Sequence, residues 1–534
     1  MATTDDDSSL QKEFDGDEFD DDSSVGDEFE SSILPDFPLG PRPTIGPEAP
    51  VNPFHESSNW SIFQVIKSIL LIPLFILRVV SMVTLMAIGY LLIKVALIGV
   101  SDPLFKPFNP WRRFMLWPVR LGARALMFTM GYYYIRIKGK PAHRSVAPVL
   151  VSNHIGFVDP IFVFYRHLPV LVSAKENVEM PIVGMFLQAL QIIPVDRASA
   201  ESRHHAAGNI RRRAMDNKWP HVMLFPEGTT TNGRAIISFK TGAFSPGLPV
   251  QPMVVRYPHK YVNPCWCDQG GLLMILFQLM TQFINFMEVE YLPVMKPTVK
   301  EMKHPQEFAD RVRSEMAKAL RVPCTEHSFL DIKLALAAEK LKQPSARSLV
   351  EFARMEKLFR LDYPTAQDYL KKFSAMNLSH SGYVTFDEFS SALDLPKSKI
   401  TEQVFHLFDK DGHGSIKFRE FLAGLAFVST HTSFASTMEA AFKACDVNED
   451  GTLSRDEVER SLLAIFPEMP PITVLKLFDT LDINHDEKIS WEEFSGFLQR
   501  NPEYLAVIMS AHPTLLRPKS PRTPRTPRTP KFSS

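Results

Sequence analysis

The fold of this chain is decided by the stretch Val149-Leu150-Val151-Ser152-Asn153-His154-Ile155-Gly156-Phe157-Val158-Asp159-Pro160. The apolar run at its start predicts a buried strand, and His154 falls just beyond the C-terminal end of that strand. Asp159 follows after four further residues, and Pro160 is a residue type that often begins a helix. Polar side chains in loops at strand ends frequently carry function, so this pair is the first candidate site.

Further short apolar runs extend through residues 146–256 and predict an α/β domain. Turns separate some of them, and stretches with helical patterning, such as 200–218, separate others. Strands that alternate with helices favour a mixed sheet flanked by helices. The predicted strands are Val149–Val151, Val170–Val172, Ile192–Val195, Val222–Phe225 and Met253–Val255.

His154 and Asp159 have the chemistry of a base and its orienting acid. Histidine is the side chain best able to accept a proton near pH 7. A nearby aspartate that accepts the other ring N–H fixes the tautomer and stabilises the imidazolium. Such a pair can activate an alcohol that attacks an acyl donor, with no serine nucleophile. Taken alone, one His and one Asp at this spacing are more often a structural pair.

A second element, Phe225-Pro226-Glu227-Gly228-Thr229, strengthens the functional interpretation. Gly228 permits a tight turn with exposed N–H groups and Thr229 adds a hydroxyl, which suits a phosphate. Lys240 and Arg197 are cations that suit the same phosphate, and Arg197 follows a predicted strand. For Arg197 alone, a surface salt bridge is the open alternative.

The order of these elements, completed by the proline-containing strand Leu248–Met253, resembles the four motifs of the glycerolipid acyltransferases. These enzymes transfer a fatty acyl group from acyl-CoA to glycerol-3-phosphate or to a lysophospholipid. The resemblance covers residues 105–300 and implies that His154 is the catalytic base and Asp159 its orienter. The implied substrate-binding residues are Arg197 for the acceptor phosphate, Glu227, Gly228 and Thr229 for the shape of that site, and Pro252 for the acyl-CoA pocket.

The chain departs from that family pattern at Gly156. The family often has a serine two residues after the histidine, where this sequence has glycine. The departure puts the placement of the acceptor in doubt more than it does the chemistry.

A loop pattern recurs at residues 377, 409, 446 and 482 and predicts calcium-binding EF-hands. Oxygen-bearing side chains alternate along each loop, and a glutamate stands at position 12. Four loops make two pairs, and a vestigial helical domain is the alternative. The predicted ligands are Asp409, Asp411, His413, Ser415 and Glu420; Asp446, Asn448, Asp450, Thr452 and Glu457; and Asp482, Asn484, Asp486, Lys488 and Glu493.

Two of the four loops depart from the pattern. In the first loop Asn377, Ser379 and Ser381 replace the acids, so we expect a structural partner with weak binding or none. The last loop has Glu487 at position 6, where a glycine usually makes the turn.

The apolar zone 62–100 predicts insertion into a membrane. It fits one tilted transmembrane helix, or two half-helices that enter and leave one leaflet with Pro73 as a break. The apolar zone Gly271–Met287 is marginal for spanning, and a surface or core helix suits it equally. Residues 107–138 mix aromatics with arginines, which favours a helix at an anionic membrane surface over a solvated basic face.

Composition separates the two ends of the chain from the domains between them. The first 30 residues carry thirteen Asp or Glu, and the last eighteen carry Lys and Arg without an acid, so both ends are predicted to be disordered. Cys265 and Cys267 lack a second Cys/His pair, which disfavours zinc. The predicted parts are an acidic and Pro-rich disordered segment 1–58, a membrane anchor 59–104, an acyltransferase domain 105–300, a helical linker 301–344, an EF-hand domain 345–510, and a basic Ser/Thr-Pro tail 511–534.

Anchor, transferase domain and EF-hands in this order resemble the lysophosphatidylcholine acyltransferase group, and above all its EF-hand-containing plant lysophosphatidylethanolamine acyltransferases. The resemblance implies re-acylation of a 1-acyl lysophospholipid by acyl-CoA, with lysophosphatidylethanolamine favoured and lysophosphatidylcholine also accepted. It implies Ca²⁺ as cofactor and an endoplasmic reticulum, Golgi or endosomal membrane, with both domains cytosolic. A homodimer stays open and nucleic acid is not expected as a partner. Alternatives are acylation of glycerol-3-phosphate or lysophosphatidate, and a membrane-tethered calcium sensor with an inactive transferase domain.

Overall fold

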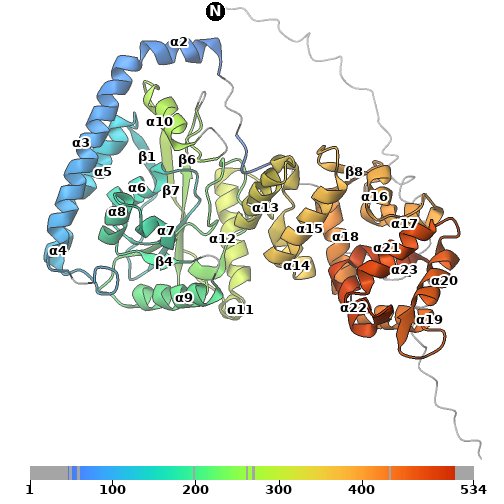
Figure 1. Cartoon of the computed structure of the whole chain (residues 1–534). Helices are drawn as coiled ribbons and strands as arrows, with labels where there is room; N and C mark the ends of the chain where they lie inside the picture. The colour runs from blue at the N-terminus through green and yellow to red at the C-terminus, as the bar shows by residue number, and fades with distance from the viewer. Residues whose placement is uncertain are drawn as a thin grey trace, which may run out of the picture. The chain divides into compact units, whose positions relative to one another are not determined.

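The computed structural model describes residues 46, 51–56, 60–100, 102–196, 199–259, 262–267, 271–431 and 434–511. Its contacts divide the chain into two compact units, whose elements Figure 1 labels. The first unit holds Ile45–Ala392 with Phe408–Gly424, and the second holds Leu393–Leu407 with the chain from Leu425 onward. Each unit is described by itself below.

A seven-stranded sheet lies at the centre of the first unit, in the order β1-β7-β6-β2-β5-β3-β4. The pairs are parallel except for β6 with β7, which is antiparallel, so the predicted mixed α/β fold is confirmed. The strands are β1 (Ile135–Lys138), β2 (Val149–Ser152), β3 (Val170–Ala174), β4 (Ile193–Val195), β5 (Val222–Leu224), β6 (Val250–Arg256) and β7 (Met287–Tyr291).

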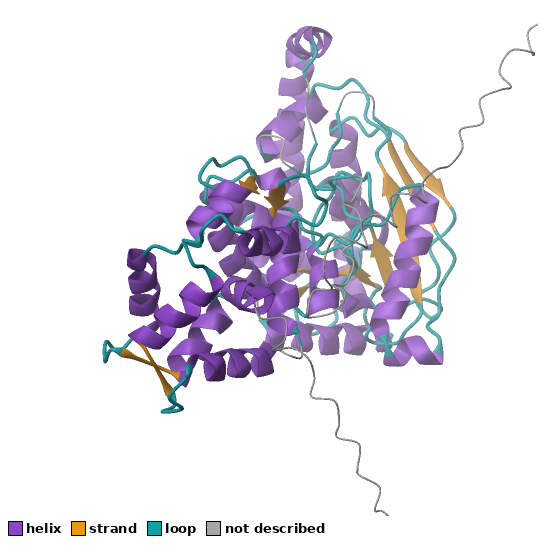
Figure 2. Ribbon diagram, turned by 90° about the vertical axis from the view of Figure 1, so that its right-hand side faces the viewer, coloured by secondary structure: helices purple, strands orange, loops and turns teal. Residues whose placement is uncertain are grey.

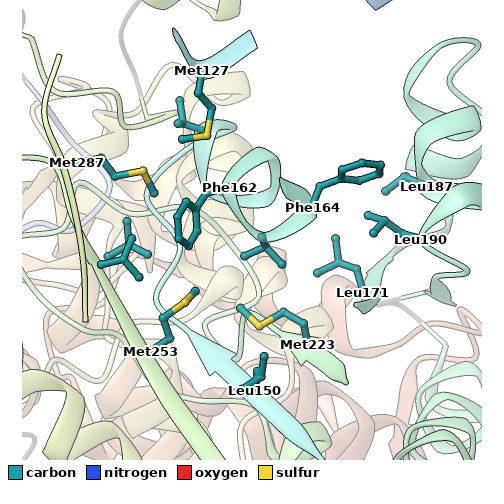
Figure 3. Packing of buried hydrophobic residues seen from close by; sticks show 14 of the residues in the cluster. Met127, Leu150, Phe162, Phe164, Leu171, Leu187, Leu190, Met223, Met253 and Met287 are labelled. Atoms are coloured by element: carbon teal, nitrogen blue, oxygen red, sulfur yellow. The ribbon is translucent and has the colours of Figure 1, made fainter. Parts of the chain in front are cut away.

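The alternation of side chains along the strands builds one core on each face of this sheet. On one face Leu150, Met223 and Met253 pack against Phe162 and Met127, as Figure 3 shows. On the other face lie the neighbouring strand residues, including Val149 and Val151. The first core is covered by α3 (Ile72–Leu97), α5 (Trp117–Thr129), α6 (Val158–His167) and α8 (Val183–Ala189), and the second by α9 (Ala200–Met215) and α12 (Pro305–Leu320).

Shorter helices complete the first unit, and helices make up most of the rest of the described chain (Figure 2). Those in the part of the chain that holds the sheet are α4 (Pro110–Met115), α7 (Lys175–Val178), α10 (Leu272–Met280) and α11 (Val299–Lys303). Those that follow are α13 (Phe329–Lys340), α14 (Phe352–Phe359), α15 (Tyr363–Met376) and α16 (Phe386–Ala392).

Two strands, β1 and β7, were not predicted from the sequence. In β7 buried apolar residues alternate with partly exposed glutamates, and Glu288 forms an ion pair with Arg136 of β1 at 3.2 Å. Cross-strand charge pairs of this kind are visible only once the strands are paired. The apolar zone Gly271–Met287 therefore holds helix α10 and the first residue of β7, and a helix of nine residues is too short to span a bilayer.

The apolar zone 62–100 forms two helices, α2 (Ile62–Leu70) and α3 (Ile72–Leu97), with Pro73 in the first turn of α3 (Figure 1). Within the described residues, α3 is the helix long and apolar enough to cross a membrane. Its Arg78 is buried, and the guanidinium donates to the carbonyl oxygens of Met280, Gln282 and Phe283. The charge inside this apolar helix is therefore satisfied by backbone carbonyls of the transferase domain.

The arginines of α4 and α5 bind backbone carbonyl groups, and the helix expected here at an anionic membrane surface stays a prediction. Arg112 donates to the carbonyl oxygen of Ala96, Arg120 to that of Tyr165, and Arg124 to that of Tyr133. These guanidinium groups are used to join the ends of neighbouring elements. The aromatic side chains between them, including Trp111 at 65% exposure, remain on the surface.

Helices α15 and α16 flank the loop at 377, and the other EF-hand helices are α17 (Lys399–Phe408), α18 (Phe418–Thr430), α19 (Phe434–Cys445), α20 (Arg455–Ile465), α21 (Pro471–Leu481) and α22 (Trp491–Arg500), followed by α23 (Pro502–Ala511). The four loops join in two pairs, as predicted. Antiparallel strands β8 (Tyr383–Thr385) and β9 (Ser415–Lys417) connect the first pair, and β10 (Thr452–Ser454) and β11 (Lys488–Ser490) connect the second.

The contacts divide the predicted EF-hand domain 345–510 between the two units, and its boundary at residue 345 stays a prediction. The loops at 377 and 409 group with the transferase unit, not with the second EF-hand pair. One reason is a buried ion pair between Arg419 and Glu351 at 2.8 Å. Another is Asn377, at position 1 of the first loop, whose amide donates to Gln343 at 2.7 Å.

Candidate active site

The loop that follows β2 is fixed to the neighbouring strand by Asn153. Its side-chain amide donates to the carbonyl oxygen of Val255 at 3.0 Å, and its side-chain oxygen accepts the Val255 N–H at 2.8 Å. Asn153 is buried, so these two bonds continue the pairing of β2 with β6 beyond the end of β2. The next residue, His154, is therefore held in place at the carboxyl edge of the sheet.

His154 and Asp159 lie side by side. Nδ1 of His154 is 2.9 Å from Oδ2 of Asp159, whose side chain is 0% exposed, whereas the imidazole is 21% exposed. Because Nδ1 faces the carboxylate, Nε2 is the ring nitrogen available to a substrate. A buried carboxylate that holds one tautomer is the arrangement needed to take a proton from a hydroxyl.

The ring of His154 is also held in its plane. It stacks on Phe225, the residue after β5, with the ring centroids 4.2 Å apart and the planes 19° apart. This contact limits rotation about the bond to the ring. The carboxylate and the phenyl ring together fix the tautomer and the orientation of the imidazole.

Asp159 accepts more hydrogen bonds than the one from His154. Its Oδ2 also accepts the backbone N–H groups of Ile155 at 2.7 Å and Gly156 at 3.0 Å. Its Oδ1 accepts the hydroxyl of Tyr257 at 2.5 Å. Sequence reasoning missed Tyr257, although it is the first residue after β6, the strand that pairs with β2.

The carboxyl group of Glu227 is buried against the backbone of the same loop. Its side chain is 0% exposed, Oε2 accepts the N–H of His154 at 2.8 Å, and Oε1 accepts the N–H of Ile237 at 3.4 Å. Burial raises the pKa of Glu227 to about 8, against the opposing effect of these hydrogen bonds. Glu227 thus shapes the site by holding the backbone of the residue that carries the imidazole.

The turn after Glu227 is open to solvent and lies beside a cation. Gly228 has φ +71°, a conformation that favours glycine, and its N–H donates to the carbonyl oxygen of Phe225 at 3.0 Å. Lys240 donates its N–H to Pro226 at 2.8 Å, and a Cβ on Gly228 would lie 3.9 Å from the Lys240 Cγ. Thr229 is partly exposed, and Lys240, whose backbone and Cγ lie beside this turn, is exposed.

Two predicted residues remain, Arg197 and Pro252. Arg197 lies outside the described residues, just beyond the end of β4 at Val195. Pro252 is buried within β6, and alternation puts it on the face of Val250 and Val254, which belong to the core with α9 and α12. Their expected contacts with the acceptor phosphate and with acyl-CoA stay predictions.

The structure explains why glycine stands at position 156, where the family often has a serine. A Cβ at this position would lie 2.4 Å from the carbonyl oxygen of Pro264, which is closer than real Cβ contacts come. The segment 262–267 is tied to the loop because Trp266 donates its N–H to the carbonyl oxygen of Ile155 at 3.0 Å. Thr230 donates to the carbonyl oxygen of Trp266 at 2.8 Å, so this segment packs against both elements of the site.

Residues 51–56 form a strap across the same region, which corrects the disorder predicted for this part of the N-terminal segment. The side-chain amide of Asn232 donates to the carbonyl oxygens of Asn52 and His55, each at 2.9 Å. Glu56 is buried, pairs with Arg234 at 2.5 Å, and accepts the amide of Asn263 at 3.3 Å. The strap thus holds the residues that follow the Glu227 turn.

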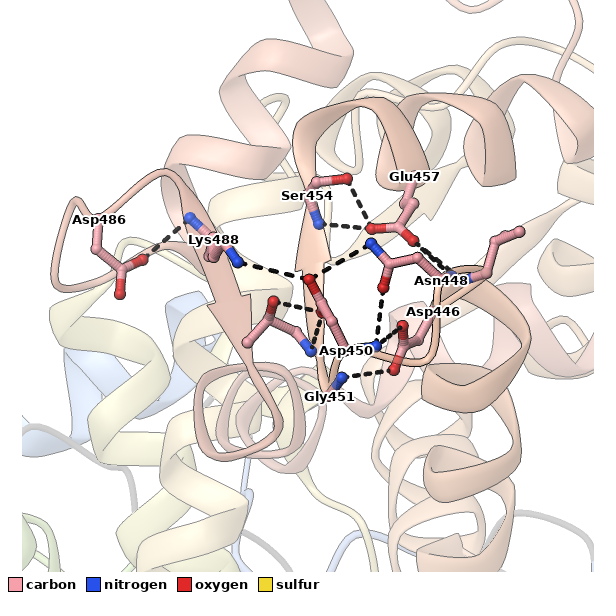
Figure 4. Close-up of polar contacts among 10 residues, drawn as sticks. Asp446, Asn448, Asp450, Gly451, Ser454, Glu457, Asp486 and Lys488 are labelled. Atoms are coloured by element: carbon pink, nitrogen blue, oxygen red, sulfur yellow. Dashed lines mark hydrogen bonds and ion pairs between the residues drawn. The ribbon is translucent and has the colours of Figure 1, made fainter.

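The second EF-hand pair carries the complete donor set for a hard cation. In the loop at 446, the carboxylate of Asp446 accepts the N–H groups of Asp450 and Gly451 at 3.1 and 3.0 Å (Figure 4). Glu457 accepts the N–H and hydroxyl of Ser454 at 3.0 and 2.6 Å. The loop at 482 repeats this arrangement with Asp482, Asp486 and Glu493. The oxygen chemistry and spacing fit Ca²⁺.

The loop at 409 brings three carboxylates together, but one of them has competing partners. Ligand oxygens of Asp409, Asp411 and Glu420 lie within 4.8 Å of one another. Asp411 is also 2.7 Å from the Lys417 ammonium and 2.6 Å from His413 Nδ1. Burial raises the pKa of Asp411, but these hydrogen bonds outweigh it and lower the pKa to about 2. The ammonium already neutralises a carboxylate that a cation would need.

Family models match residues in both units. A family model described as Acyltransferase matches residues 135–256, and two described as EF-hand domain pair match residues 380–425 and 435–499. Among solved structures, the 1-acyl-sn-glycerophosphate acyltransferase of Thermotoga maritima aligns over 97% of its own chain and 47% of this one, at 15% identity and a TM-score of 0.34.

Full-length relatives identify the family. The chain is 37% identical to the lysophospholipid acyltransferase LPEAT2 of Arabidopsis thaliana, over 87% of this chain and 86% of that one. It is 35% identical to the lysophosphatidylcholine acyltransferase 2 of Mus musculus, over 91% and 89% of the two chains. Fold, site and matches together define an acyltransferase enzyme. Within that class, the chain belongs to the lysophospholipid acyltransferase family.

Proposed function

We propose that this enzyme transfers a fatty acyl group from acyl-CoA to the free hydroxyl of a lysophospholipid, with lysophosphatidylethanolamine as the favoured acceptor. The observation that carries the proposal is the pair of His154 and Asp159 at the carboxyl edge of the sheet, with Nδ1 and Oδ2 2.9 Å apart and the imidazole partly exposed. The names of the full-length relatives support a lysophospholipid as the acceptor.

In this mechanism His154 acts through Nε2. It accepts the proton of the lysophospholipid hydroxyl while that oxygen attacks the thioester carbon of acyl-CoA. An ester C–O bond forms and the C–S bond breaks, and the imidazolium returns its proton to the departing CoA thiolate. Asp159 stabilises the imidazolium and remains a carboxylate, so the enzyme ends in the state in which it began.

The acceptor is held in the proposal through its phosphate. The turn at Gly228 and Thr229 offers the Thr229 hydroxyl, and Lys240 lies alongside it. Arg197 is proposed to complete this phosphate site. Acylation of glycerol-3-phosphate or lysophosphatidate would use the same groups, so a parallel assay of the three acceptors distinguishes them, with the highest kcat/KM expected for lysophosphatidylethanolamine.

Replacing His154 with alanine tests the chemistry. We expect a fall in kcat of at least about a thousand-fold for the transfer of labelled acyl from acyl-CoA, because the base is lost. His205→Ala is the matched control, because that imidazole is exposed on α9, and it should retain wild-type activity. An active His154→Ala enzyme would contradict the catalytic role and favour another mechanism.

We further propose that α2 and α3 insert into one leaflet and do not cross the bilayer. Gly89 of α3 packs against Phe186, where a Cβ would lie 3.2 Å from the ring, and Ile93 is buried. The chain on both sides of the two helices is bound to the transferase unit: the strap 51–56 before them, and residues 103–108 after them through Gln191. A crossing helix would have to separate these two segments.

The calcium part of the proposal concerns the loops 446–457 and 482–493, whose acidic and amide oxygens suit Ca²⁺. We propose that calcium binding there modulates acyl transfer. We also propose that both units face the cytosol at an endoplasmic reticulum, Golgi or endosomal membrane. Calcium-binding loops on that side would respond to changes in cytosolic calcium concentration.

A further inference from the structure

We propose that Tyr257 is a positioning residue for acyl transfer, and that its hydroxyl controls the carboxylate that orients the base. The proposal rests on the catalytic role proposed above for His154. Tyr257 acts through Asp159, because its hydroxyl lies 2.5 Å from Oδ1, while His154 binds Oδ2 of the same carboxylate. Within the described part of the chain, the two oxygens of Asp159 thus have separate duties.

The hydroxyl is brought to Asp159 by the sheet itself. β6 pairs in parallel with β2, and Asn153 bonds both the N–H and the carbonyl group of Val255. The carboxyl ends of the two strands therefore lie side by side. Tyr257, two residues later, is 6% exposed, and its ring packs edge-on against Tyr132 with the centroids 5.9 Å apart. This packing leaves the hydroxyl a fixed donor to the carboxylate.

The Tyr257 hydroxyl is important because few other groups stabilise the charge of Asp159. Asp159 is 0% exposed, and the titratable groups that face it are His154, Tyr132, Tyr257 and the buried Glu227, with Arg313 acting on Glu227 from α12. The negative charge of Asp159 is therefore stabilised chiefly by hydrogen bonds. Burial and then the charge of Asp159 raise the pKa of Tyr257, so its hydroxyl keeps its proton across the working pH range.

Loss of this hydroxyl has a defined consequence. Oδ1 would then sit in a water-poor environment without its donor, and the carboxylate would bind the imidazolium form of His154 more strongly. A base that holds its proton more tightly becomes active only at higher pH. We therefore expect the acidic limb of the kcat–pH profile to move upward, and kcat at neutral pH to fall about ten-fold.

The test is the pH dependence of kcat and KM for the full chain carrying Tyr257→Phe. We expect the shifted acidic limb with little change in KM, because Tyr257 is buried and does not face a substrate. Tyr291→Phe is the matched control: this tyrosine is equally buried, on the adjacent strand, and its hydroxyl bonds His167 at 2.7 Å, away from the dyad. Its profile should match that of the wild type.

A double-mutant cycle with Asp159→Asn gives a second measure that remains valid if Tyr257→Phe lowers stability. If Tyr257 acts through Asp159, adding Tyr257→Phe to Asp159→Asn causes no further loss of kcat. Losses that multiply, an unshifted acidic limb, or the same shift in Tyr291→Phe would each overturn the inference. An active His154→Ala enzyme would instead overturn the proposed function, so the two failures are distinguishable.

Discussion

His154 is held by two carboxyl groups with different duties. Asp159 bonds the imidazole and Glu227 accepts the backbone N–H, at 2.9 and 2.8 Å. Both are fully buried, yet Asp159 has four donors, whereas the described contacts of Glu227 are two backbone N–H groups. With two donors, Glu227 does not offset the cost of burial, which raises its pKa to about 8.

The raised pKa of Glu227 predicts a pH-dependent stability. Between its ordinary pKa of 4.5 and about 8, the folded protein keeps a proton that the unfolded chain has released. Stability therefore falls as pH rises through this range. Glu227→Gln keeps a carbonyl acceptor for the N–H of His154 but cannot ionise, so its thermal unfolding midpoint should fall less than that of the wild type between pH 5 and pH 8.

The exposed Glu201 provides the control for this measurement, since Glu201→Gln should follow the wild-type curve. A Glu227→Gln curve parallel to that of the wild type would show that Glu227 is ionised in the folded protein. It would then be a carboxylate that stabilises the loop only through its hydrogen bonds.

Whether a site residue could be predicted depended on how far it lies along the sequence from His154 and Asp159 or from a recognisable motif. His154 and Asp159 stand in one loop and Glu227 in a short motif, so local patterns suffice to find them. Tyr257 and the segment 262–267 reach the site through the β2–β6 pairing, across about a hundred residues. Such contacts are fixed by strand order, which single-sequence patterns do not encode.

At the level of elements, the EF-hand loops differ in what satisfies their acids. In the degenerate loop at 377, Asn377 accepts the hydroxyl of Ser379 at 3.0 Å, so the loop is closed by its own polar groups. In the loop at 409, Lys417 holds Asp411. In the loop at 446 the acids of the ligand positions accept backbone N–H groups and hydroxyls, and Asp450 also pairs with the Lys488 ammonium at 3.5 Å (Figure 4). This ion pair is longer than the 2.7 Å pair at Asp411, so we expect calcium to bind the second pair of loops most tightly.

Calcium modulation can be tested through Glu457, the glutamate at position 12. Activity of the full chain is measured across free calcium concentrations for the wild type and Glu457→Gln. We expect the variant to need at least about ten-fold more calcium, because it loses a bidentate charged ligand. Glu449→Gln makes the same change at an exposed, non-ligand position of the loop and should behave as the wild type. Identical curves for all three proteins would exclude regulation through this loop.

The elements found from the sequence are those with a strong single pattern. β2 to β6 are short apolar runs, and the EF-hand loops have fixed ligand spacing, so each is recognisable alone. β1 and β7 carry charged residues that gain partners only across the sheet, as Arg136 and Glu288 do. The carbonyl groups that the arginines of α4 and α5 bind lie in other elements, so the sequence pattern did not indicate them.

For the whole molecule, α3 makes an unusual membrane helix. Its 26 residues are about 39 Å long, enough to cross a bilayer, yet its ends are bound to the transferase unit through Arg78 and through Arg112. The larger part of its surface remains exposed, with 17% of its most apolar window buried. One side of the helix is thus exposed, while the other side packs against the transferase core.

Insertion into one leaflet predicts that the chain before α2 and the chain after α3 lie on the same side of the membrane. Cysteines introduced by Val51→Cys and Asp102→Cys should both react with an impermeant maleimide in sealed vesicles that expose the cytosolic face. The unsubstituted protein gives the background of the native cysteines. Labelling of one position only after the vesicles are opened would show that α3 crosses.

The strap 51–56 sets a limit on how this protein can be shortened. Trimming the chain to the first strand of the sheet looks like a natural way to obtain a soluble catalytic fragment. Such a fragment would lack Glu56 and the carbonyl groups that hold Asn232, leaving Arg234 and Asn263 without these partners. A shortened protein that begins before residue 51 keeps its active-site loops anchored. Such a protein must also include the apolar helices α2 and α3.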